Sequence, residues 1–162
     1  MRKSILFAIL VGLTSTSWAS ENDLLVDLSP TAVFQSTSGA SNPALGGTLG
    51  LTWGFNDRTD LGGFFHFDNA DLDGTKNTVQ AYTFGLQSWF TPMSGDIRPQ
   101  AGGRMGLTYI DGSASLDLAF QARVLAELTT RTRIFAGGNL GGDLGGKGRS
   151  FATVDFGLQI LL

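Results

Sequence analysis

His66 and Asp68 are the two residues whose types and spacing could support catalysis. His66 is the only histidine of the 162 residues, and Asp68 follows two positions later. Side chains two apart on a β-strand point to the same face, so this carboxylate can orient the imidazole as in a Ser-His-Asp hydrolase. The sequence does not name the serine; Ser29 and Ser88 are candidates by location only. We favour the alternative, a structural histidine that is hydrogen-bonded to a carboxylate.

Two glycine-containing motifs resemble ligand-binding loops but lack residues that the ligands require. Asn69–Gly74 alternates oxygen ligands before a glycine, as a calcium loop does, but its twelfth position is Gln80 instead of a bidentate Glu. Gly141–Gly148 approaches the phosphate-binding pattern G-x-x-x-x-G-K, yet it has Gly148 where Ser or Thr is needed and leads into a strand. We expect both to be outer loops, and we predict neither a cofactor nor a metal site.

The elements that carry these residues show the periodicity of β-strands. In Leu116–Leu128 alternate residues form a row without charge, and the residues between them form a polar, ionised row. Ser150–Leu162 repeats this pattern. An apolar face opposite a charged face, at period two, is required of a strand between lipid and a polar barrel interior. The charge-free row of the first segment is Leu116, Leu118, Phe120, Ala122, Val124, Ala126 and Leu128.

Eight segments share this pattern, and most are near the ~9–11 residues that a tilted membrane strand needs. Tight polar turns alternate with connections rich in Gly, Ser, Asn and Asp, as in barrels with short periplasmic turns and outer loops. We therefore predict an all-β fold, an eight-stranded antiparallel up-and-down transmembrane β-barrel, whose closure leaves no strand edge in lipid. The predicted strands are Leu24–Ser36, Gly46–Asn56, Asp60–Asp68, Val79–Phe90, Asp96–Ile110, Ser115–Leu128, Thr132–Gly141 and Ser150–Leu162. The predicted outer loops are Thr37–Leu45, Asn69–Thr78, Asp111–Ala114 and Gly142–Arg149.

Residues 1–19 have the features of a secretory signal peptide, and residues 20–162 form the predicted barrel domain. Arg2 and Lys3 precede an apolar run, and Ser17-Trp18-Ala19 is a small-x-small cleavage site. Removing Arg2 and Lys3 from the 11 basic residues leaves nine against 14 acidic ones, a formal net charge of −5. This balance argues against nucleic acid as a partner, because such binding needs clustered Lys and Arg. The chain has no cysteine, so no disulfide can stabilise the fold.

Aromatic residues lie near both ends of the predicted strands, where membrane barrels carry aromatic belts. The predicted belt residues are Trp53, Phe55, Phe65, Phe67, Tyr82, Trp89, Phe90 and Tyr109. The alternative is a soluble sandwich with aromatic residues at the corners of its core.

The inward rows carry charges of both signs that nearly cancel. Charges in such an interior persist only when they are paired and hydrogen-bonded, and the planar fork of Arg suits bidentate pairing. Eight strands enclose an interior just wide enough for side chains, so we expect a plugged barrel; the alternative is a narrow gated channel. The predicted interior charge network is Asp27, Asp68, Arg98, Arg104, Asp117, Arg123, Glu127, Arg133 and Asp155.

With these features the mature chain resembles the small eight-stranded outer-membrane barrels of Gram-negative bacteria, of the OmpA-transmembrane and OmpX kind. The terminal Val154–Leu162 is similar to the signal that the barrel-assembly machinery reads, although that signal usually ends in Phe and this chain ends in Leu162. Phe65–Asp68 running into Asp71–Gly74 is faintly similar to the YfaZ family of outer-membrane proteins. The resemblance implies the bacterial outer membrane as the location, with lipid, lipopolysaccharide and the assembly machinery as partners.

We therefore expect a non-enzymatic, monomeric outer-membrane barrel with a structural or surface role and short outer loops. One alternative is an outer-leaflet lipid-modifying enzyme that uses His66, and another is a narrow channel for ions or polar solutes. A soluble lipocalin-like carrier is a further alternative, and it predicts the reverse pattern, with the apolar rows facing inward.

Overall fold

The computed structural model describes residues 23–37, 40–71, 78–145 and 149–162, which form eight β-strands joined by turns. The predicted signal peptide, residues 1–19, lies outside the described residues. Within the described ranges, no helix has the length and apolar character needed to cross a membrane. The strands are β1 Leu24–Thr37, β2 Ala40–Asn56, β3 Thr59–Asp71, β4 Thr78–Phe90, β5 Ile97–Ile110, β6 Ser113–Thr129, β7 Thr132–Leu144 and β8 Ser150–Leu161.

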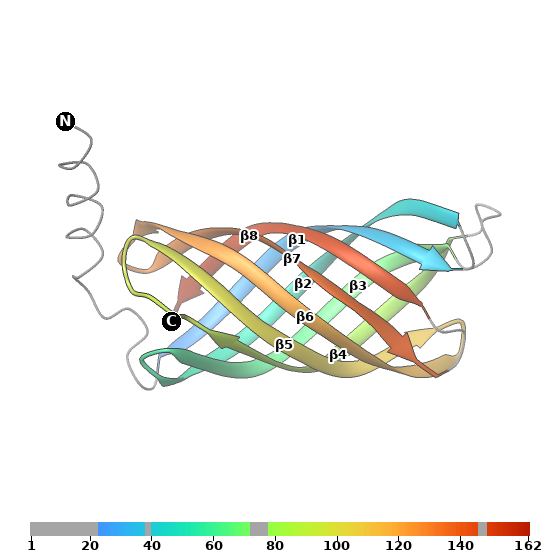
Figure 1. The fold of residues 1–162 in the computed structure, drawn as a ribbon, viewed down its shortest axis with the longest axis horizontal. Helices are drawn as coiled ribbons and strands as arrows, with labels where there is room; N and C mark the ends of the chain where they lie inside the picture. The colour runs from blue at the N-terminus through green and yellow to red at the C-terminus, as the bar shows by residue number, and fades with distance from the viewer. Residues whose placement is uncertain (1–22, 38–39, 72–77, 146–148) are drawn as a thin grey trace.

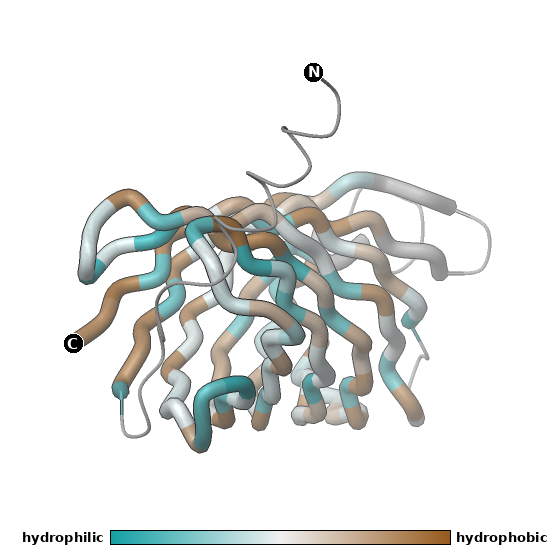
Figure 2. Tube along the Cα trace, turned by 60° about the vertical axis from the view of Figure 1, so that its left-hand side comes forward, coloured by the Kyte–Doolittle hydropathy of each residue, from teal (hydrophilic) through white to brown (hydrophobic). Residues whose placement is uncertain are grey.

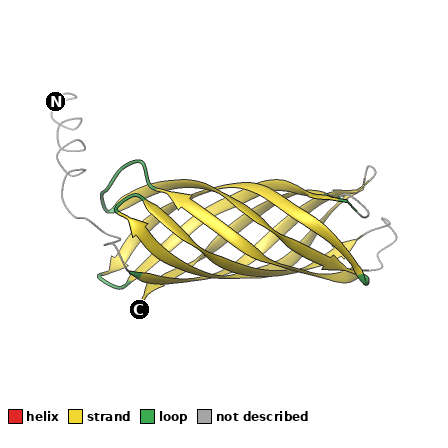
Figure 3. Cartoon of the chain, turned by 90° about the horizontal axis from the view of Figure 1, so that it is seen from below, coloured by secondary structure: helices red, strands yellow, loops and turns green. Residues whose placement is uncertain are grey.

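The eight strands form one closed antiparallel barrel in which each strand pairs with its neighbours in the sequence (Figure 1). β1 closes the barrel by pairing with β8, with Val26 opposite Ile160 and Ala32 opposite Val154. Closure removes the free edges, so the strands can satisfy their backbone hydrogen bonds within the sheet. Figure 3 shows the strands running along the barrel, with turns and loops confined to its two ends. The predicted eight-stranded up-and-down barrel is confirmed.

The two ends of the barrel differ in their connections. The turns at residues 57–58, 91–96 and 130–131 lie at the same end as the start of β1 and the C-terminus, which we call the turn end (Figure 1). The C-terminal ends of β1, β3, β5 and β7 lie at the opposite end, the loop end. There Asp111 and Gly112 have φ angles of 49° and 74°, the left-handed values of a two-residue type I′ turn. Because Asp-Gly favours this turn, β5 and β6 meet in a tight hairpin instead of the predicted four-residue loop.

Several strands extend further toward the loop end than the sequence predicts. β1 and β2 remain paired until Thr37 lies opposite Ala40, and β3 and β7 continue to Asp71 and Leu144. The physical reason is that an antiparallel neighbour supplies backbone hydrogen bonds to Gly, Ser and Asn as readily as to other residues. Parts of both ligand-like motifs, residues 72–74 and 146–148, lie outside the described residues. The predicted outer loops that are wrong in their bounds, because strands extend into them, are Thr37–Leu45, Asn69–Thr78 and Gly142–Arg149.

The barrel has an apolar outer face and a polar interior, the reverse of a soluble protein. Large hydrophobic side chains are exposed on the outer face; Leu86 is 64% and Ile97 62% exposed. On β4, the strand of Leu86, the inward-facing Thr83 and Gln87 are buried. Figure 2 shows hydrophobic and hydrophilic residues interspersed along the same strands. This arrangement suits a hydrocarbon environment and excludes both the lipocalin-like carrier and the soluble sandwich.

Two glycines allow neighbouring strands to approach closely where the wall curves. A Cβ atom on Gly102 would lie 1.8 Å from the carbonyl oxygen of Ser88, and one on Gly85 would lie 2.1 Å from that of Met105. Side chains cannot be accommodated at such distances, so the wall requires glycine at both positions.

Candidate functional site: the packed polar lumen

The candidate functional site is the lumen, where charged side chains from several strands converge. Among the described residues, six aspartates and five arginines are buried there together with His66. The formal charges of these aspartates and arginines leave one excess negative charge. The buried charged residues are Asp27, Asp60, Asp68, Asp117, Asp143, Asp155, Arg98, Arg104, Arg123, Arg133 and Arg149.

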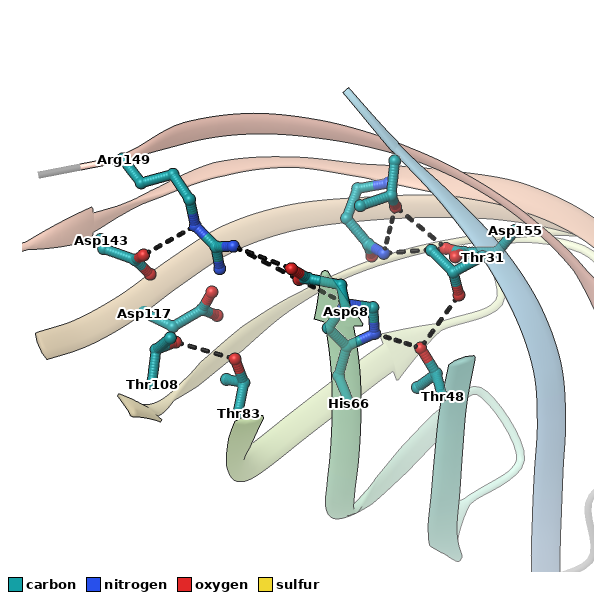
Figure 4. Close-up of polar contacts among 12 residues, drawn as sticks. Thr31, Thr48, His66, Asp68, Thr83, Thr108, Asp117, Asp143, Arg149 and Asp155 are labelled. Atoms are coloured by element: carbon teal, nitrogen blue, oxygen red, sulfur yellow. Dashed lines mark hydrogen bonds and ion pairs between the residues drawn. The ribbon is translucent and has the colours of Figure 1, made fainter. Parts of the chain in front are cut away.

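Five residues form a hydrogen-bonded chain near the loop end, which we call the loop-end cluster. Figure 4 shows Arg149 between Asp68 and Asp143. Arg149 Nη1 donates to the two carboxylate oxygens of Asp68 at 3.1 and 3.3 Å, and Nε donates to Asp143 at 2.9 Å. His66 lies between Asp68 and Thr48, with Nε2 3.1 Å from Asp68 Oδ2 and Nδ1 2.8 Å from Thr48 Oγ1. The cluster thereby joins β2, β3 and β7 with the residue that precedes β8.

Arg104 and Asp117 form an ion pair between β5 and β6. Arg104 Nε and Nη2 donate to the two oxygens of Asp117 at 3.1 and 3.4 Å. The guanidinium also lies over two rings, with its Cζ atom 5.0 Å from the centroid of Phe64 and 5.2 Å from that of Phe151. Both charged side chains are almost fully buried, so the hydrogen bonds and the ring contacts offset the loss of water.

Arg123 is the centre of a second cluster, nearer the turn end, which we call the Arg123 cluster. Arg123 Nη1 donates to Asp27 Oδ2 at 2.9 Å, and Nε donates to Gln100 at 2.7 Å. Gln159 donates to the other oxygen of Asp27 at 2.9 Å. The Arg123 Cζ atom lies 4.0 Å from the ring centroid of Trp89. Because Asp27 is on β1 and Arg123 on β6, the cluster connects strands that do not pair with each other.

Three residues of the predicted network lie at the turn end. Arg98 Nε donates to the carbonyl oxygen of Gly95 at 2.9 Å, and Arg133 Nη1 donates to Gln159 Oε1 at 2.7 Å. Glu127 is half-buried where β6 and β7 shift register, and its charge attracts those of Arg98 and Arg133. Arg98 and Arg133 thus bind a backbone carbonyl and an amide oxygen at the turn end, within the field of Glu127.

Asp155 borders a small cavity in the middle of the lumen. Its carboxylate accepts hydrogen bonds from Asn139 at 2.8 Å and from Thr153 at 3.2 Å. The cavity measures about 30 Å³, and it is also lined by Trp89 and Arg123. Trp89 Nε1, Arg123 Nη2 and Asp155 Oδ1 are buried without a hydrogen-bond partner in the protein. A space of this size with donors and an acceptor suits a single water molecule.

Seven of the eight predicted belt residues lie exposed on the outer face. Among them Phe65 stacks on Tyr82, with the ring centroids 6.3 Å apart. Trp89 is different, because it is 6% exposed and stacks on Arg123 inside the lumen. The predicted belt position of Trp89 is therefore wrong; the alternation along β4 turns residue 89 inward. The exposed belt residues are Trp53, Phe55, Phe65, Phe67, Tyr82, Phe90 and Tyr109.

Three buried charges are missing from the predicted network. Asp143 and Arg149 fall in the glycine-rich segment that the composition assigns to an outer loop. Asp60 lies an even number of positions before Asp68 on β3, so the alternation alone could have placed it in the lumen. The same signal could have identified the buried aromatic residues Phe64, Phe135 and Phe151.

The loop-end cluster supplies the hydroxyl group that the sequence did not name. It belongs to Thr48, whereas among the described residues no hydrogen bond joins Ser29 or Ser88 to His66. Thr48, His66 and Asp68 follow the order nucleophile, base and carboxylate. Yet His66 is 2% exposed, and the internal cavity that Thr48 borders is the size of one water molecule. The geometry suits a structural hydrogen-bond chain better than a site that admits a lipid ester.

Comparison with solved structures identifies the fold. Neisserial surface protein A aligns with a TM-score of 0.73 at 14% identity, over 86% of this chain and 97% of that chain. OprG from Pseudomonas aeruginosa aligns at 0.62 and 12% identity, over 91% and 99%. Ail, the attachment invasion locus protein of Yersinia pestis, aligns at 0.57 and 13% identity, over 88% and 99%. The chain has the fold of the small eight-stranded outer-membrane barrels.

This fold and the apolar outer face confirm the predicted location, the bacterial outer membrane. No family model and no curated protein matches the sequence. The faint similarity to the YfaZ family is therefore not confirmed. At these low identities the structural neighbours establish the fold of this barrel, and its function has to be argued from the lumen.

Proposed function

We propose that the protein is a non-enzymatic barrel of the outer membrane whose lumen is plugged by its own side chains. The supporting observation is that the loop-end cluster and the Arg123 cluster cross the lumen at two levels, and that the cavity lined by Thr48 of the first and by Asp27 and Arg123 of the second measures about 30 Å³. Separating a buried ion pair leaves uncompensated charge, so each cluster resists opening. The plug therefore favours a structural or surface role over transport.

The proposed role is in envelope structure or in contact with partners at the cell surface. The two-residue turn between β5 and β6 supports the structural part of this role, because that hairpin projects no long binding loop. Neighbours named as a surface protein and an attachment protein share the fold. The proposal includes removal of residues 1–19, a monomeric barrel of residues 20–162 in contact with lipid and lipopolysaccharide, and assembly through the C-terminal strand β8.

Planar-bilayer recording tests the plug. We expect the purified barrel to give no conductance steps. The variant Arg104→Ala with Arg123→Ala removes two plug side chains and leaves the carboxylates of Asp27 and Asp117, so it should give cation-preferring steps. Its mobility on an unboiled gel checks that the barrel is folded. Steps from the unmodified protein would contradict the proposal and support the narrow channel.

The enzyme alternative has one observation in its favour, the contact of His66 with both Thr48 and Asp68. It can be tested with His66→Ala and Thr48→Ala expressed in cells that lack the wild-type protein. We expect the lipid A profile, measured by mass spectrometry, to be the same as that of cells with the unmodified barrel. A profile that changes in both variants, with the barrel folded, would replace the structural role by lipid modification.

A further inference from the structure

An apolar groove of about 630 Å³ lies on the outer face, where β1, β2, β3 and β8 meet. Two of the residues that line it, Pro30 on β1 and Gly47 on β2, lie opposite each other. Phe67 pairs with Gly47 on one side, and Phe156 lines the other. Two residues with small side chains between two phenyl rings thus produce a trough in an otherwise bulky surface.

Gly47 is the residue that keeps the trough open. A Cβ atom at this position would lie 2.8 and 3.0 Å from two ring atoms of Phe67. A larger side chain would therefore displace the ring and occupy the trough itself. The backbone does not obstruct such a change, because the nearest backbone atom to the added Cβ is the carbonyl oxygen of Ser29 at 3.5 Å. The shape of the groove can thus be altered without breaking the barrel wall.

The strand pairing is interrupted next to this groove. The register on either side places Pro30 opposite Phe156, but the described part of β1 shows no pairing with β8 at Ser29 and Pro30. The Leu24 carbonyl accepts a hydrogen bond from the Leu162 amide, so the even-numbered residues of β1 direct their backbone groups toward β8. Proline has no N–H group to donate there. The groove therefore covers the weakest stretch of the seam that closes the barrel.

We propose that this groove binds one acyl chain of a membrane lipid, which lies across the seam between β1 and β8. The groove is continuous with the charge-free face that contacts lipid, and Leu28, Leu49 and Leu158 line it with aliphatic side chains. A trough between two phenyl rings accommodates a flexible linear chain, whereas the convex outer face of a second barrel would not enter it. The apolar chain gains contacts that a flat wall does not offer. The proposal is independent of the role suggested for the lumen.

Photo-crosslinking tests the site in the full-length mature barrel. The protein is reconstituted into vesicles of phosphatidylethanolamine and phosphatidylglycerol that contain a trace of phosphatidylethanolamine with a diazirine on one acyl chain. After illumination, the labelled peptides are mapped by mass spectrometry. We expect the strand segments around Pro30, Phe67 and Phe156 to be labelled about tenfold more than those around the exposed Val124 and Ala136, because a site retains one chain longer than the open wall does. Even labelling around the barrel would overturn the proposal.

Paired variants connect the labelling with the groove. Gly47→Leu fills the trough and should reduce the labelling to the level of the open wall. Gly103→Leu is its control, because Gly103 lies on the outer face of β5 and an added Cβ has its nearest contact at 3.7 Å. Unchanged labelling of Gly47→Leu would contradict the proposal. A dimer that forms upon chemical crosslinking and disappears in Gly47→Leu would also contradict it, since the occupant would then be a second copy of the chain.

A second pair decides the question if Gly47→Leu does not fold. Phe67→Ala removes one wall of the groove and should likewise lower the labelling of the segment around Phe156. Phe84→Ala removes a phenyl ring of similar exposure on β4, outside the groove, and should leave that labelling unchanged. Equal labelling of the two alanine variants would overturn the proposal.

Discussion

Three arginines of the lumen each combine an ion pair with contact to an aromatic ring. Arg104 and Arg149 both lie over Phe151, and Arg123 lies over Trp89. The guanidinium is weakly hydrated and planar, so a ring face can replace part of its water while the N–H groups bind carboxylates. This combination explains how these three arginines are accommodated in the buried interior of the barrel.

Asp68→Ala is expected to lower the free energy of unfolding by about 3–5 kcal/mol, because it removes a partner of both Arg149 and His66 from a buried cluster. Asp57→Ala, in an exposed turn, is the control and should change the same quantity by about 0.5 kcal/mol or less. Both values can be measured by urea unfolding of the barrel in phospholipid vesicles. A loss for Asp68→Ala that is no larger than the control would show that the loop-end cluster does not hold the strands together.

At the scale of residues, the sequence predicts faces but not partners. Alternation places Asp27 and Arg123 in the lumen, yet they are 96 positions apart and only the closed barrel shows that they meet. Alternation also turns Trp89 inward, but its residue type suggested an aromatic belt. The residue type alone is ambiguous, because an aromatic ring can either lie at a membrane interface or pack against a buried guanidinium, as Trp89 does.

The strands themselves are limited by pairing more than by composition. β1 and β2 stay paired through a segment whose Ser, Asn, Pro and Gly residues suggest a loop. The residue types of a segment indicate its intrinsic β-propensity. Pairing with an antiparallel neighbour can outweigh a low propensity and keep the segment in the strand. The sequence therefore predicts the eight strands and their order, but not their length toward the loop end. For this reason the residue composition around Asp143 and Arg149 predicts an outer loop and not the lumen.

Two adjacent glycines of β5 provide a test of the close approach between strands. Gly102→Ala should destabilise the barrel by about 3 kcal/mol, because the added Cβ would lie 1.8 Å from the Ser88 carbonyl oxygen. Gly103→Ala is the matched control, since its Cβ meets nothing nearer than 3.7 Å. The free energy of unfolding and the folded fraction on an unboiled gel measure the difference. Equal values for the two variants would mean that the wall can widen at this point.

The molecule as a whole is a cylinder whose hydrogen-bonded wall has no free edge. Every strand pairs on both sides, and β1 closes on β8. Such a wall resists unfolding by detergent, because it has no edge strand with unpaired backbone groups. Its closure follows from an even number of amphipathic strands and could be predicted from the sequence. The weak position at Pro30 could not, because the side on which a missing N–H falls depends on the register.

Gel mobility with and without boiling tests this closure. We expect the barrel from the membrane fraction to migrate differently before and after boiling, because the closed wall resists detergent until it is heated. The mobility of a sample boiled in detergent and urea serves as the reference for the unfolded chain. Recovery of the protein in the soluble periplasmic fraction, with the same mobility in both lanes, would contradict the membrane barrel.

The two tryptophans of the described residues occupy opposite sides of the wall. Trp53 is 44% exposed on the outer face, while Trp89 is enclosed against a guanidinium. During assembly the first indole passes into hydrocarbon and the second reaches its final surroundings only when the lumen is complete. The fluorescence of Trp53 therefore follows insertion, and that of Trp89 follows closure. Single-tryptophan variants would separate these two events in time, so the natural tryptophans of the barrel can serve as fluorescence probes of its insertion and of its closure.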